Sequence, residues 1–370
     1  MSLVRTDCRF FNGFKPCSEH KLRGTTCDLN CQSFSPPDMR ILIIKTGAAG
    51  DVIRTTPVLR KLRELHPAAE IIWLSKFPEL VPTDGVDQKI FFDWENSLGL
   101  LHQKFDLLLS LDKSSPEAGI AAKIDAKIKK GFLLDQNGKI IPADQDAEFK
   151  WKTGFDDNLM KTNTQHFVEE TFKICGYQFS GEKYWIDDCV AWKAPSSTGA
   201  PVIGLNTGCG DRWTARLWPE SHFENLAASL IKSGFGVILL GGQSEDQKNI
   251  RLAQRTGATY HGVKSLKDFS SVVSSCDVIV TSVTMTLHLA IAKAKRTILF
   301  NNIFPTNEFY LYGHGEILEP KLNCQACYKP QYDLHCPVSD CMSIITPQEA
   351  FAAVERQIKV LEKSPISISV

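Results

Sequence analysis

Short apolar runs alternate with amphipathic segments along most of the chain. The first run covers residues 41–44 and leads through a turn from Gly47 to Gly50 into a segment at 52–65 with helical spacing. A β-branched run that passes through a glycine turn into a helix is typical of a βα unit in a parallel sheet. The pattern predicts an α/β protein whose ligands bind at the carboxyl ends of its strands.

The same alternation occurs in both halves of the chain, which predicts two parallel-sheet domains. In the first half we expect strands at 70–75, 89–92 and 107–111, and helices at 116–126 (with a basic end at 127–132) and 164–177. The polar residues 135–165 are expected to be irregular. In the second half we expect strands at 202–206, 236–240, 258–260, 278–281 and 296–300, helices at 220–233, 245–256 and 265–276, another centred on His288, and a closing helix at 346–362.

Composition divides the chain of 370 residues into five parts. A stretch rich in Ser, Pro and Gly at 187–200 is the predicted linker between the two domains. The predicted parts are a Cys-rich N-terminal segment (1–38), a first Rossmann-like domain (39–190), a second Rossmann-like domain (199–320), a Cys-rich knuckle (321–345), and a closing helix with a tail (346–370).

The net charge is zero, because 42 Lys and Arg residues balance 42 Asp and Glu residues, and this argues against nucleic acid as a partner. No apolar run is long enough to span a bilayer, and the first residues lack the apolar core of a signal peptide. We therefore expect a cytoplasmic protein. Basic residues in the first half, such as Arg54, Arg60 and Lys127, lie either on solvent-exposed helix faces or on a surface that binds an acidic acceptor.

Asp51 follows the first glycine turn directly. The turn reads G-x-x-G-D and is not the dinucleotide fingerprint, and the run at 71–76 lacks the expected acidic end. A carboxylate at a helix N-terminus is stabilised in its ionised form by the helix dipole. Asp51 is therefore either a helix N-cap or a functional carboxylate at the mouth of a site.

Eight of the twelve cysteines lie in two clusters, one toward each end of the chain. In a reducing compartment such clusters indicate metal binding more often than disulfides. Four thiolates match a tetrahedral structural site, which accepts zinc or iron, and the alternatives are surface thiols or one site shared by both clusters. The predicted ligands are Cys8, Cys17, Cys27 and Cys31 (C-x8-C-x9-C-x3-C) and Cys324, Cys327, Cys336 and Cys341 (C-x2-C-x8-C-x4-C).

Residues 40–320 resemble the family of GT-B glycosyltransferases that includes the ADP-heptose:lipopolysaccharide heptosyltransferases. The resemblance rests on four stretches: ILIIKTGAAGDVIRTTPVLRKLRELHPAAEI, PVIGLNTGCGDRWTARLWPESHFENLA, VILLGGQSEDQ and CDVIVTSVTMTLHLAIAKAKRTILF. It implies a GT-B fold, with two Rossmann-like domains that face a cleft and the Cys-rich parts as small metal-binding appendages. It also implies inverting transfer of a sugar from a nucleotide-diphosphate donor, with ADP as the expected nucleotide and without a catalytic metal.

The resemblance assigns roles to individual residues. Asp51 would be the general base that takes the proton of the acceptor hydroxyl. Arg216 stands where the family commonly has a Lys, and His288 is either a donor contact or a packed core residue. The implied donor and phosphate contacts are Thr207, Gly208, Arg216, Gly241, Gly242, Glu245, Thr284, Met285, Thr286 and His288, and the implied acceptor contacts are Gly50, Arg54, Arg60 and Lys127.

One stretch departs from the family pattern, which usually reads Asp-Thr-Gly-x-x-His. Here Val283 replaces the Asp that contacts the donor sugar, and Met285 replaces the Gly. Valine cannot hydrogen-bond a sugar hydroxyl. The donor is therefore not ADP-heptose, or another residue holds the sugar, for which Asn302 and Glu308 are candidates.

The leading hypothesis is a glycosyltransferase that acts on a cell-envelope glycolipid such as lipopolysaccharide core, peripherally at the inner membrane. A second reading is protein glycosylation, because a branch of the family that glycosylates proteins carries a four-cysteine iron site near its C-terminus. A third is a non-catalytic protein that binds sugar nucleotides and mediates assembly, which the departures at Val283 and Met285 favour. A cysteine-based redox protein is disfavoured, because neither cluster has a ferredoxin spacing.

Overall fold

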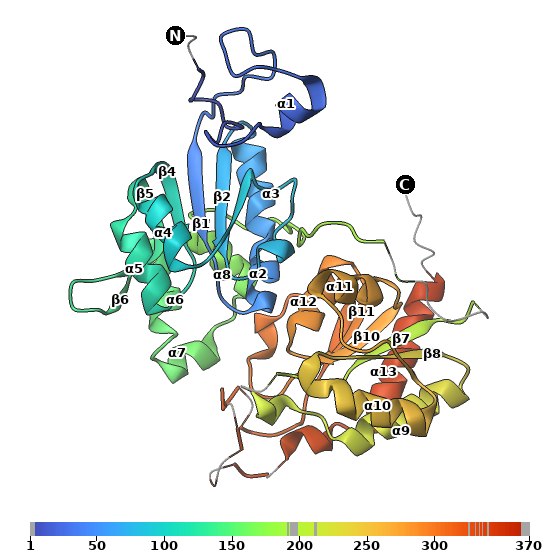
Figure 1. Cartoon of the computed structure of the whole chain (residues 1–370). Helices are drawn as coiled ribbons and strands as arrows, with labels where there is room; N and C mark the ends of the chain where they lie inside the picture. Colours follow the sequence, from blue (N-terminus) through green and yellow to red (C-terminus); the bar gives the residue numbers. More distant parts are fainter. Residues whose placement is uncertain are drawn as a thin grey trace. The chain divides into compact units, whose positions relative to one another are not determined.

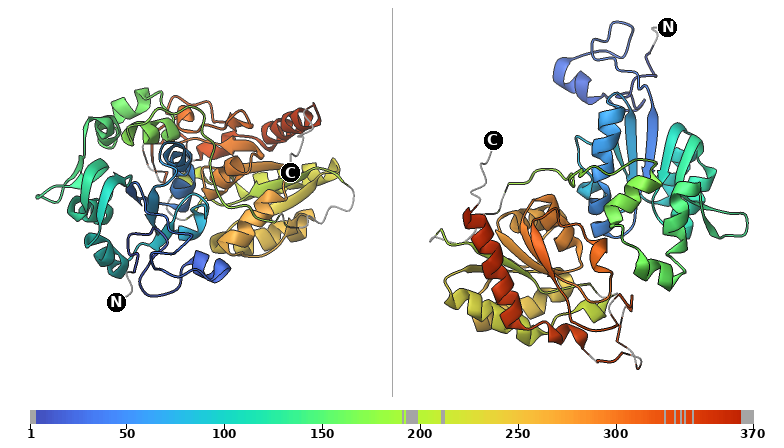
Figure 2. Two further views of the ribbon diagram at one scale, coloured as in Figure 1. Left: turned by 90° about the horizontal axis from the view of Figure 1, so that it is seen from above. Right: turned by 180° about the vertical axis from the view of Figure 1, so that it is seen from behind.

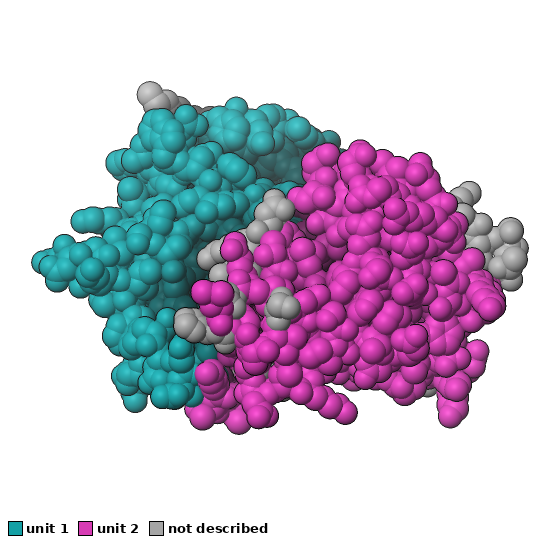
Figure 3. All heavy atoms as spheres, turned by 90° about the horizontal axis from the view of Figure 1, so that it is seen from below, with its two compact units in different colours: residues 1–160, 168–187 teal, residues 161–167, 188–370 magenta. Residues whose placement is uncertain are grey.

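The computed structural model describes residues 4–190, 192, 199–210, 213–324, 326–329, 331–332, 334, 336–338 and 340–363. The chain forms two compact units (Figure 1). Unit 1 comprises residues 1–160 and 168–187, and unit 2 comprises residues 161–167 and 188–370, as coloured in Figure 3. Part of the predicted linker lies outside the described residues.

Unit 1 is built on a six-stranded sheet in the order β3-β2-β1-β4-β5-β6, in which only β6 is antiparallel to its neighbour. The first strand is central, so its end at Ile44 lies between Leu74 and Ser110 of the flanking strands. The strands are β1 (Arg40–Ile44), β2 (Glu70–Ser75), β3 (Gln88–Phe91), β4 (Lys104–Ser110), β5 (Asp125–Leu134) and β6 (Ile140–Pro142).

Helices surround this sheet, and their apolar sides meet it in a core that includes Leu42, Ile72 and Leu108, which are fully buried. The helices in this part of the chain are α1 (Ser18–Arg23), α2 (Ala49–Thr55), α3 (Pro57–Leu65), η1 (Pro78–Leu80), α4 (Trp94–Leu101), α5 (Ser115–Lys123), α6 (Gln145–Lys152), α7 (Asp157–Thr162) and α8 (Phe167–Ile174).

Unit 2 has a second six-stranded sheet, in the order β12-β11-β10-β7-β8-β9, in which each strand is parallel to its neighbours. Its strands are β7 (Val202–Asn206), β8 (Gly236–Leu240), β9 (Thr259–Tyr260), β10 (Val278–Ser282), β11 (Arg296–Phe300) and β12 (Gly315–Leu318). Its helices are η2 (Thr214–Arg216), α9 (Glu220–Lys232), η3 (Gln243–Glu245), α10 (Asp246–Thr256), α11 (Leu266–Ser274), α12 (Met285–Ala292), η4 (Thr306–Glu308), η5 (Cys341–Ile344) and α13 (Pro347–Lys363).

The closing helix α13 runs along one face of the unit 2 sheet, as Figure 2 shows. Its buried residues Ala350, Val354 and Ile358 join the core under β10 and β11. Within the described part of the chain, no helix combines the length and the low charge that a membrane crossing requires. The prediction of two parallel-sheet α/β domains is confirmed.

Three local predictions were wrong. The single helix at 52–65 is divided into α2 and α3, because Pro57 cannot donate a backbone hydrogen bond inside a helix and instead occupies the first position of α3. Residues 127–132 belong to strand β5 rather than to a helix end. The stretch at 135–165 is not irregular, because it contains β6, α6 and α7.

Candidate functional site in two parts

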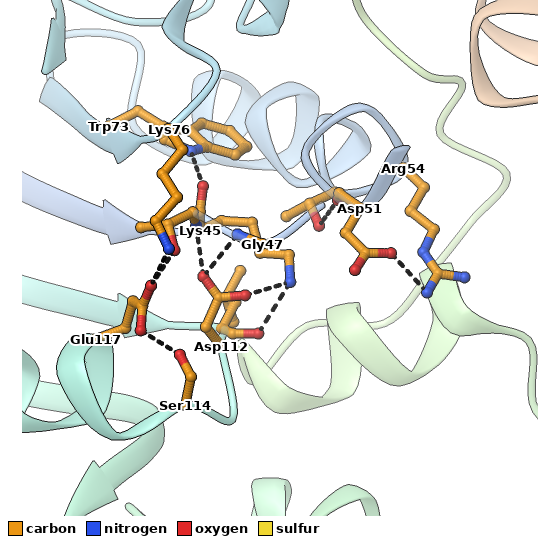
Figure 4. Close-up of polar contacts among 12 residues, drawn as sticks. Lys45, Gly47, Asp51, Arg54, Trp73, Lys76, Asp112, Ser114 and Glu117 are labelled. Atoms are coloured by element: carbon orange, nitrogen blue, oxygen red, sulfur yellow. Dashed lines mark hydrogen bonds and ion pairs between the residues drawn. The ribbon is translucent and has the colours of Figure 1, made fainter. Parts of the chain in front are cut away.

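Asp51 lies in the first turn of α2, directly beyond the carboxyl end of β1. Its side chain is 33% exposed, and its carboxylate Oδ1 lies 2.8 Å from Nη2 of Arg54 (Figure 4). The N-cap of α2 is Ala48, so the reading of Asp51 as an N-cap is wrong. Asp51 is a partly exposed carboxylate whose negative charge is stabilised by a neighbouring guanidinium and by the helix dipole.

A buried ion pair holds the turn that leads to Asp51. Nζ of Lys45 lies 2.6 Å from Oδ1 of Asp112, and these residues are only 5% and 6% exposed. The other oxygen of Asp112 accepts hydrogen bonds from the backbone N–H of Thr46 and, at 3.2 Å, of Gly47. We call these four residues the turn clamp. It ties the end of β1 to the residue that follows β4, and so fixes the start of the loop that carries Asp51.

Glu117 extends this polar network on the other side of Thr46. It is 2% exposed, and its carboxylate accepts hydrogen bonds from the hydroxyls of Thr46 and Ser114 and lies 3.3 Å from Nζ of Lys76. Burial acts to raise the pKa of Glu117, but the bonds from Ser114 and Thr46, a backbone hydrogen bond and the charge of Lys76 together lower the pKa. The carboxylate therefore stays ionised and acts as a fixed acceptor beneath the turn.

Gly47 is a glycine because three polar groups converge on it. A Cβ at this position would lie 3.0 Å from Oδ1 of Asp112, 3.1 Å from Nζ of Lys45 and 3.5 Å from Oδ2 of Asp51. Nζ of Lys45 and Oδ2 of Asp51 are thus no more than about 7 Å apart, close enough for the lysine charge to act on the carboxylate.

Two of the four predicted acceptor residues lie in the helix that carries Asp51, and the other two make contacts elsewhere in unit 1. Gly50 is buried in α2, and Arg54 lies beside Asp51. The guanidinium of Arg60 donates to the backbone carbonyls of residues 183 and 184, so it anchors the end of unit 1. Lys127 pairs with Asp106 at 2.7 Å near the start of β4.

Lys127 is not brought to Asp51, because it lies at the amino edge of the sheet. It is next to Ile128, whose partner in β4 is Leu107, and Leu107 in turn pairs with Ile41 at the start of β1. Asp51 follows the opposite end of β1, which is roughly 10–13 Å away at the rise of a parallel strand. The sequence placed Lys127 on a basic helix end, whereas the structure places it on β5, away from the turn that carries Asp51.

In unit 2, hydrogen bonds with side chains of α10 and of Asn206 hold the turn after β7. The hydroxyl of Thr207 donates to Oδ1 of Asn249 at 2.6 Å, and Nζ of Lys248 donates to the carbonyl of Thr207 at 2.7 Å. Burial lowers the pKa of Lys248. Nδ2 of Asn206 donates to the carbonyl of Gly208 and to the hydroxyl of Thr284, which joins this turn to the start of α12.

The glycines after β8 make room for Glu245. A Cβ at Gly241 would lie 2.6 Å from Cβ of Glu245, and one at Gly208 would overlap the Glu245 carboxyl group. The backbone N–H of Gly242 donates to Oε2 of Glu245 at 2.8 Å. The predicted set of Gly208, Gly241, Gly242 and Glu245 is therefore brought together at the carboxyl edge of the unit 2 sheet.

Arg216 is 9% exposed and lies at the end of η2. Its guanidinium donates to the backbone carbonyls of Cys209 (2.9 Å), Trp213 (3.4 Å) and Val283. Burial lowers its pKa, but an arginine keeps its charge at any physiological pH. Three of its five N–H groups are thus used to connect η2 with the turns after β7 and β10.

The turn after β10 leads into α12, where Thr284 is the N-cap and accepts a hydrogen bond from the N–H of Thr286. Thr286 and His288 are 3% and 4% exposed, whereas Met285 is half-buried. The candidates Asn302 and Glu308 contact the C-terminal region instead. Nδ2 of Asn302 donates to the carbonyl of Ala215 and to Sγ of Cys341, and Glu308 accepts from the hydroxyl of Tyr328.

The sequence did not reveal the turn clamp or the polar residues Asn206, Lys248 and Asn249. A signal was available for some of them, because Lys45 and Asn206 each stand at the end of an apolar strand, where ligand sites of parallel sheets lie. Among the described residues, no three His, Cys, Asp or Glu side chains form a group arranged to hold a metal ion. The predicted Cys-rich metal sites are therefore not shown in this structure.

Comparison with known proteins connects these turns to a family. Residues 98–307 match the model of glycosyltransferase family 9 (heptosyltransferase). The chain is 24% identical over 328 residues to lipopolysaccharide heptosyltransferase 1 of Escherichia coli O18:K1:H7, a match that covers 80% of this chain and 93% of that protein.

Solved structures share the fold. The E. coli heptosyltransferase WaaC with ADP-2-deoxy-2-fluoro heptose has a TM-score of 0.60 at 18% identity, over 86% of this chain and 99% of that one. The iron-containing dodecameric glycosyltransferase TibC from enterotoxigenic E. coli H10407 has a TM-score of 0.54 at 15% identity, over 92% of this chain and 81% of that one. At these identities the likeness concerns the fold alone.

Proposed function

Because the chain belongs to glycosyltransferase family 9, the heptosyltransferase family, we propose that it transfers a heptose or related sugar from an ADP-linked donor to a saccharide of the lipopolysaccharide core. The observation that carries the proposal is Asp51, a partly exposed, ion-paired carboxylate at the carboxyl end of the central strand of unit 1. The curated relative is a lipopolysaccharide heptosyltransferase, and WaaC is solved with an ADP-linked deoxyfluoro heptose.

The proposed reaction is a single displacement that inverts the anomeric carbon. The acceptor hydroxyl oxygen attacks that carbon, Asp51 takes the hydroxyl proton, and the bond from the carbon to the diphosphate oxygen breaks. Arg54 holds Oδ1 of Asp51, and Lys45 and Asp112 fix the turn that carries it. No catalytic metal takes part in this proposal, so the protein itself must stabilise the charge of the leaving diphosphate.

The donor is proposed to bind in unit 2. The N–H groups at the start of α12 and the cation of Lys248 beside Thr207 are suited to a diphosphate, because both offer positive charge at the carboxyl edge of the sheet. Arg216 adds a cation at the junction of three turns. Gly241 and Gly242 allow the ribose and base to approach the backbone, and Glu245 is the proposed ribose contact.

A protein acceptor is the second candidate, favoured by the C-terminal cysteine cluster, and the iron-containing glycosyltransferase TibC shares the fold. Sγ of Cys341 accepts a hydrogen bond from Asn302, and burial raises the pKa of Cys327, to which Cys324, Cys336 and Cys341 add. The proposed ligands of a structural zinc or iron ion are these four thiols. The hydroxyl of Tyr332, in the same segment as these cysteines, donates a hydrogen bond to the carbonyl of Ala215. An ion that holds this segment would therefore also support η2 and Arg216.

A nucleotide panel tests the proposed donor. A ligand that binds only the folded state at 100 times its Kd stabilises it by about 2.7 kcal/mol, so ADP should raise the unfolding midpoint of unit 2 by roughly 5–10 °C. The measurement is thermal unfolding with ADP, GDP, UDP, AMP and adenosine. If a different nucleoside diphosphate causes the shift, that nucleotide and not ADP belongs to the donor. If no nucleotide causes a shift, the result favours a non-catalytic protein, which the departures at Val283 and Met285 also favour.

Substituting Arg216→Met tests the diphosphate contact. The substitution keeps the length of the side chain but removes its charge, so ADP affinity should fall about 10-fold or more, the worth of charge-assisted hydrogen bonds. Adenosine affinity should change by less than about twofold, because the nucleoside does not reach this cation. Arg255→Met is the control, since Arg255 lies in the same unit in an exposed pair with Glu224. Equal losses for ADP and adenosine would show that Arg216 only maintains the fold.

A further inference from the structure

The N-terminal segment, residues 4–38, lacks the means to fold on its own apolar core. It contains no strand and one short helix, α1. Three of its large apolar side chains, Phe14, Leu22 and Leu29, are 78%, 77% and 65% exposed, and none of them is fully buried. A segment of this length without a sheet or a buried core usually needs disulfides or a metal to be stable.

Four cysteines face one small cavity in this segment. Cys8, Cys17, Cys27 and Cys31 line a space of about 10 Å³, with Arg5 and Phe34 in the same wall. All four are unbridged thiols in the structure. About 10 Å³ is the space of a single water-sized sphere, so the four cysteines surround a small space.

Hydrogen bonds order the backbone around three of the four cysteines. Cys17 is the N-cap of α1, and its Sγ accepts a hydrogen bond from the N–H of His20 at 3.4 Å. Tight turns follow Cys8 and Cys31, closed by the N–H of Phe11 on the Cys8 carbonyl and the N–H of Phe34 on the Cys31 carbonyl. Nδ1 of His20 is engaged with the carbonyl of Thr25, and His20 is not among the residues that line the cavity, whereas all four cysteines are.

We propose that Cys8, Cys17, Cys27 and Cys31 bind one Zn²⁺ or Fe²⁺ ion as four thiolates. On binding, each thiol gives its proton to solvent and forms one sulfur–metal bond, so four protons are released and the site carries a net charge of about −2. The His20 N–H offsets part of that charge, as does Arg5 in the cavity wall, whose guanidinium also pairs with Asp7. The sulfurs are not yet in coordinating geometry, so binding includes rotation of the cysteine side chains.

The site goes beyond the proposed function, because it lies at the edge of unit 1 opposite Asp51. Arg9 of the segment lies 3.3 Å from Asp87, which also binds Arg63 and the N–H of Ile71 at the start of β2. Figure 1 shows the segment beyond the starts of β1 and β2, whereas Asp51 follows the end of β1. The ion therefore fixes the segment to the amino edge of the sheet and takes no part in sugar transfer.

Cobalt titration of the full chain tests this site. The wild type, Cys27→Ser/Cys31→Ser and Cys324→Ser/Cys327→Ser are purified under reducing conditions, stripped of metal and titrated with Co²⁺, whose charge-transfer absorption reports thiolate ligands. The N-terminal variant should bind about one equivalent less than the wild type, and the C-terminal variant should retain about one equivalent. Metal in the wild type should also slow proteolysis of residues 4–38.

Two results would overturn the inference: an N-terminal variant that binds as much Co²⁺ as the wild type, or a C-terminal variant that binds none. If Cys27→Ser/Cys31→Ser does not fold, the C-terminal variant alone decides, since only the N-terminal cluster is intact in it. The ADP-induced thermal shift should be the same in the wild type and the N-terminal variant. If the wild type binds the metal but shows no thermal shift with ADP, the result counts against the proposed donor site and not against the metal site.

Discussion

Asp51→Asn is expected to lower kcat for sugar transfer by about 10³-fold, within the 10²–10⁴ range of general acid–base catalysis. Asparagine keeps the size of the side chain but cannot accept the proton of the acceptor hydroxyl. The affinity for ADP should be unchanged, because the donor contacts proposed for the nucleotide all belong to unit 2. The measurement is the rate of ADP release from the donor in the presence of acceptor, together with ADP binding at equilibrium.

The fold should tolerate this substitution, which separates chemistry from stability. Asp51 gains about 0.3–1 kcal/mol from the dipole of α2 and at most about 1 kcal/mol from its partly exposed pair with Arg54. Asp157→Asn is the matched control, since Asp157 is an exposed carboxylate in the first turn of α7. A fully active Asp51→Asn protein would remove Asp51 as the base, and loss of ADP binding would indicate damage beyond the catalytic step.

The central parts of both sheets could be predicted from the sequence. Strands such as β1, β7 and β10 are continuous apolar runs because both faces of a parallel sheet are covered, and each ends in a turn with Gly, Thr or Asp. A turn after such a strand is a candidate site by position alone. The strand–turn pattern alone predicts a site at the Asp51 turn, whereas the Thr207–Gly208 turn is assigned to the donor by the family resemblance.

Strand β5 could not be predicted in the same way, because it lies toward the edge of the sheet. Its residues alternate between lysines and apolar side chains, and they follow α5 without a clear break. What identifies the strand is its partner β4. Gly131 has a positive φ and packs so close to the backbone of Ser110 that no Cβ would fit, and this contact is invisible in sequence.

The polar support of the candidate site also depends on which strands are neighbours. Lys45 and Asp112 are separated by 67 positions and meet only because β1 lies beside β4. Asn249 and Thr207 meet because α10 follows β8, the neighbour of β7. Residue type and local spacing identify Asp51 as a carboxylate at a turn, but the groups that hold the turn come from the tertiary pairing.

Asp112→Ala is expected to destabilise unit 1 by about 3–5 kcal/mol, because it leaves the buried ammonium of Lys45 without its carboxylate. It also removes the acceptor of the Thr46 and Gly47 N–H groups, so the start of the Asp51 loop loses its fixed position. We expect kcat to fall as well, since small displacements of a catalytic group lower the rate strongly. Denaturant unfolding followed by a unit 1 probe, such as Trp73 fluorescence, measures the stability.

Two further variants separate the clamp from a general loss of charge. Asp125→Ala breaks the exposed Lys104–Asp125 pair of the same sheet and should cost less than about 1 kcal/mol. The double variant Lys45→Met/Asp112→Ala should be more stable than Asp112→Ala, because it no longer buries an unpaired charge. Its activity should stay low, because nothing replaces the hydrogen bonds that hold the turn. If Asp112→Ala destabilises no more than Asp125→Ala, the Lys45–Asp112 pair does not hold the turn, and the position of Asp51 is set by α2 itself.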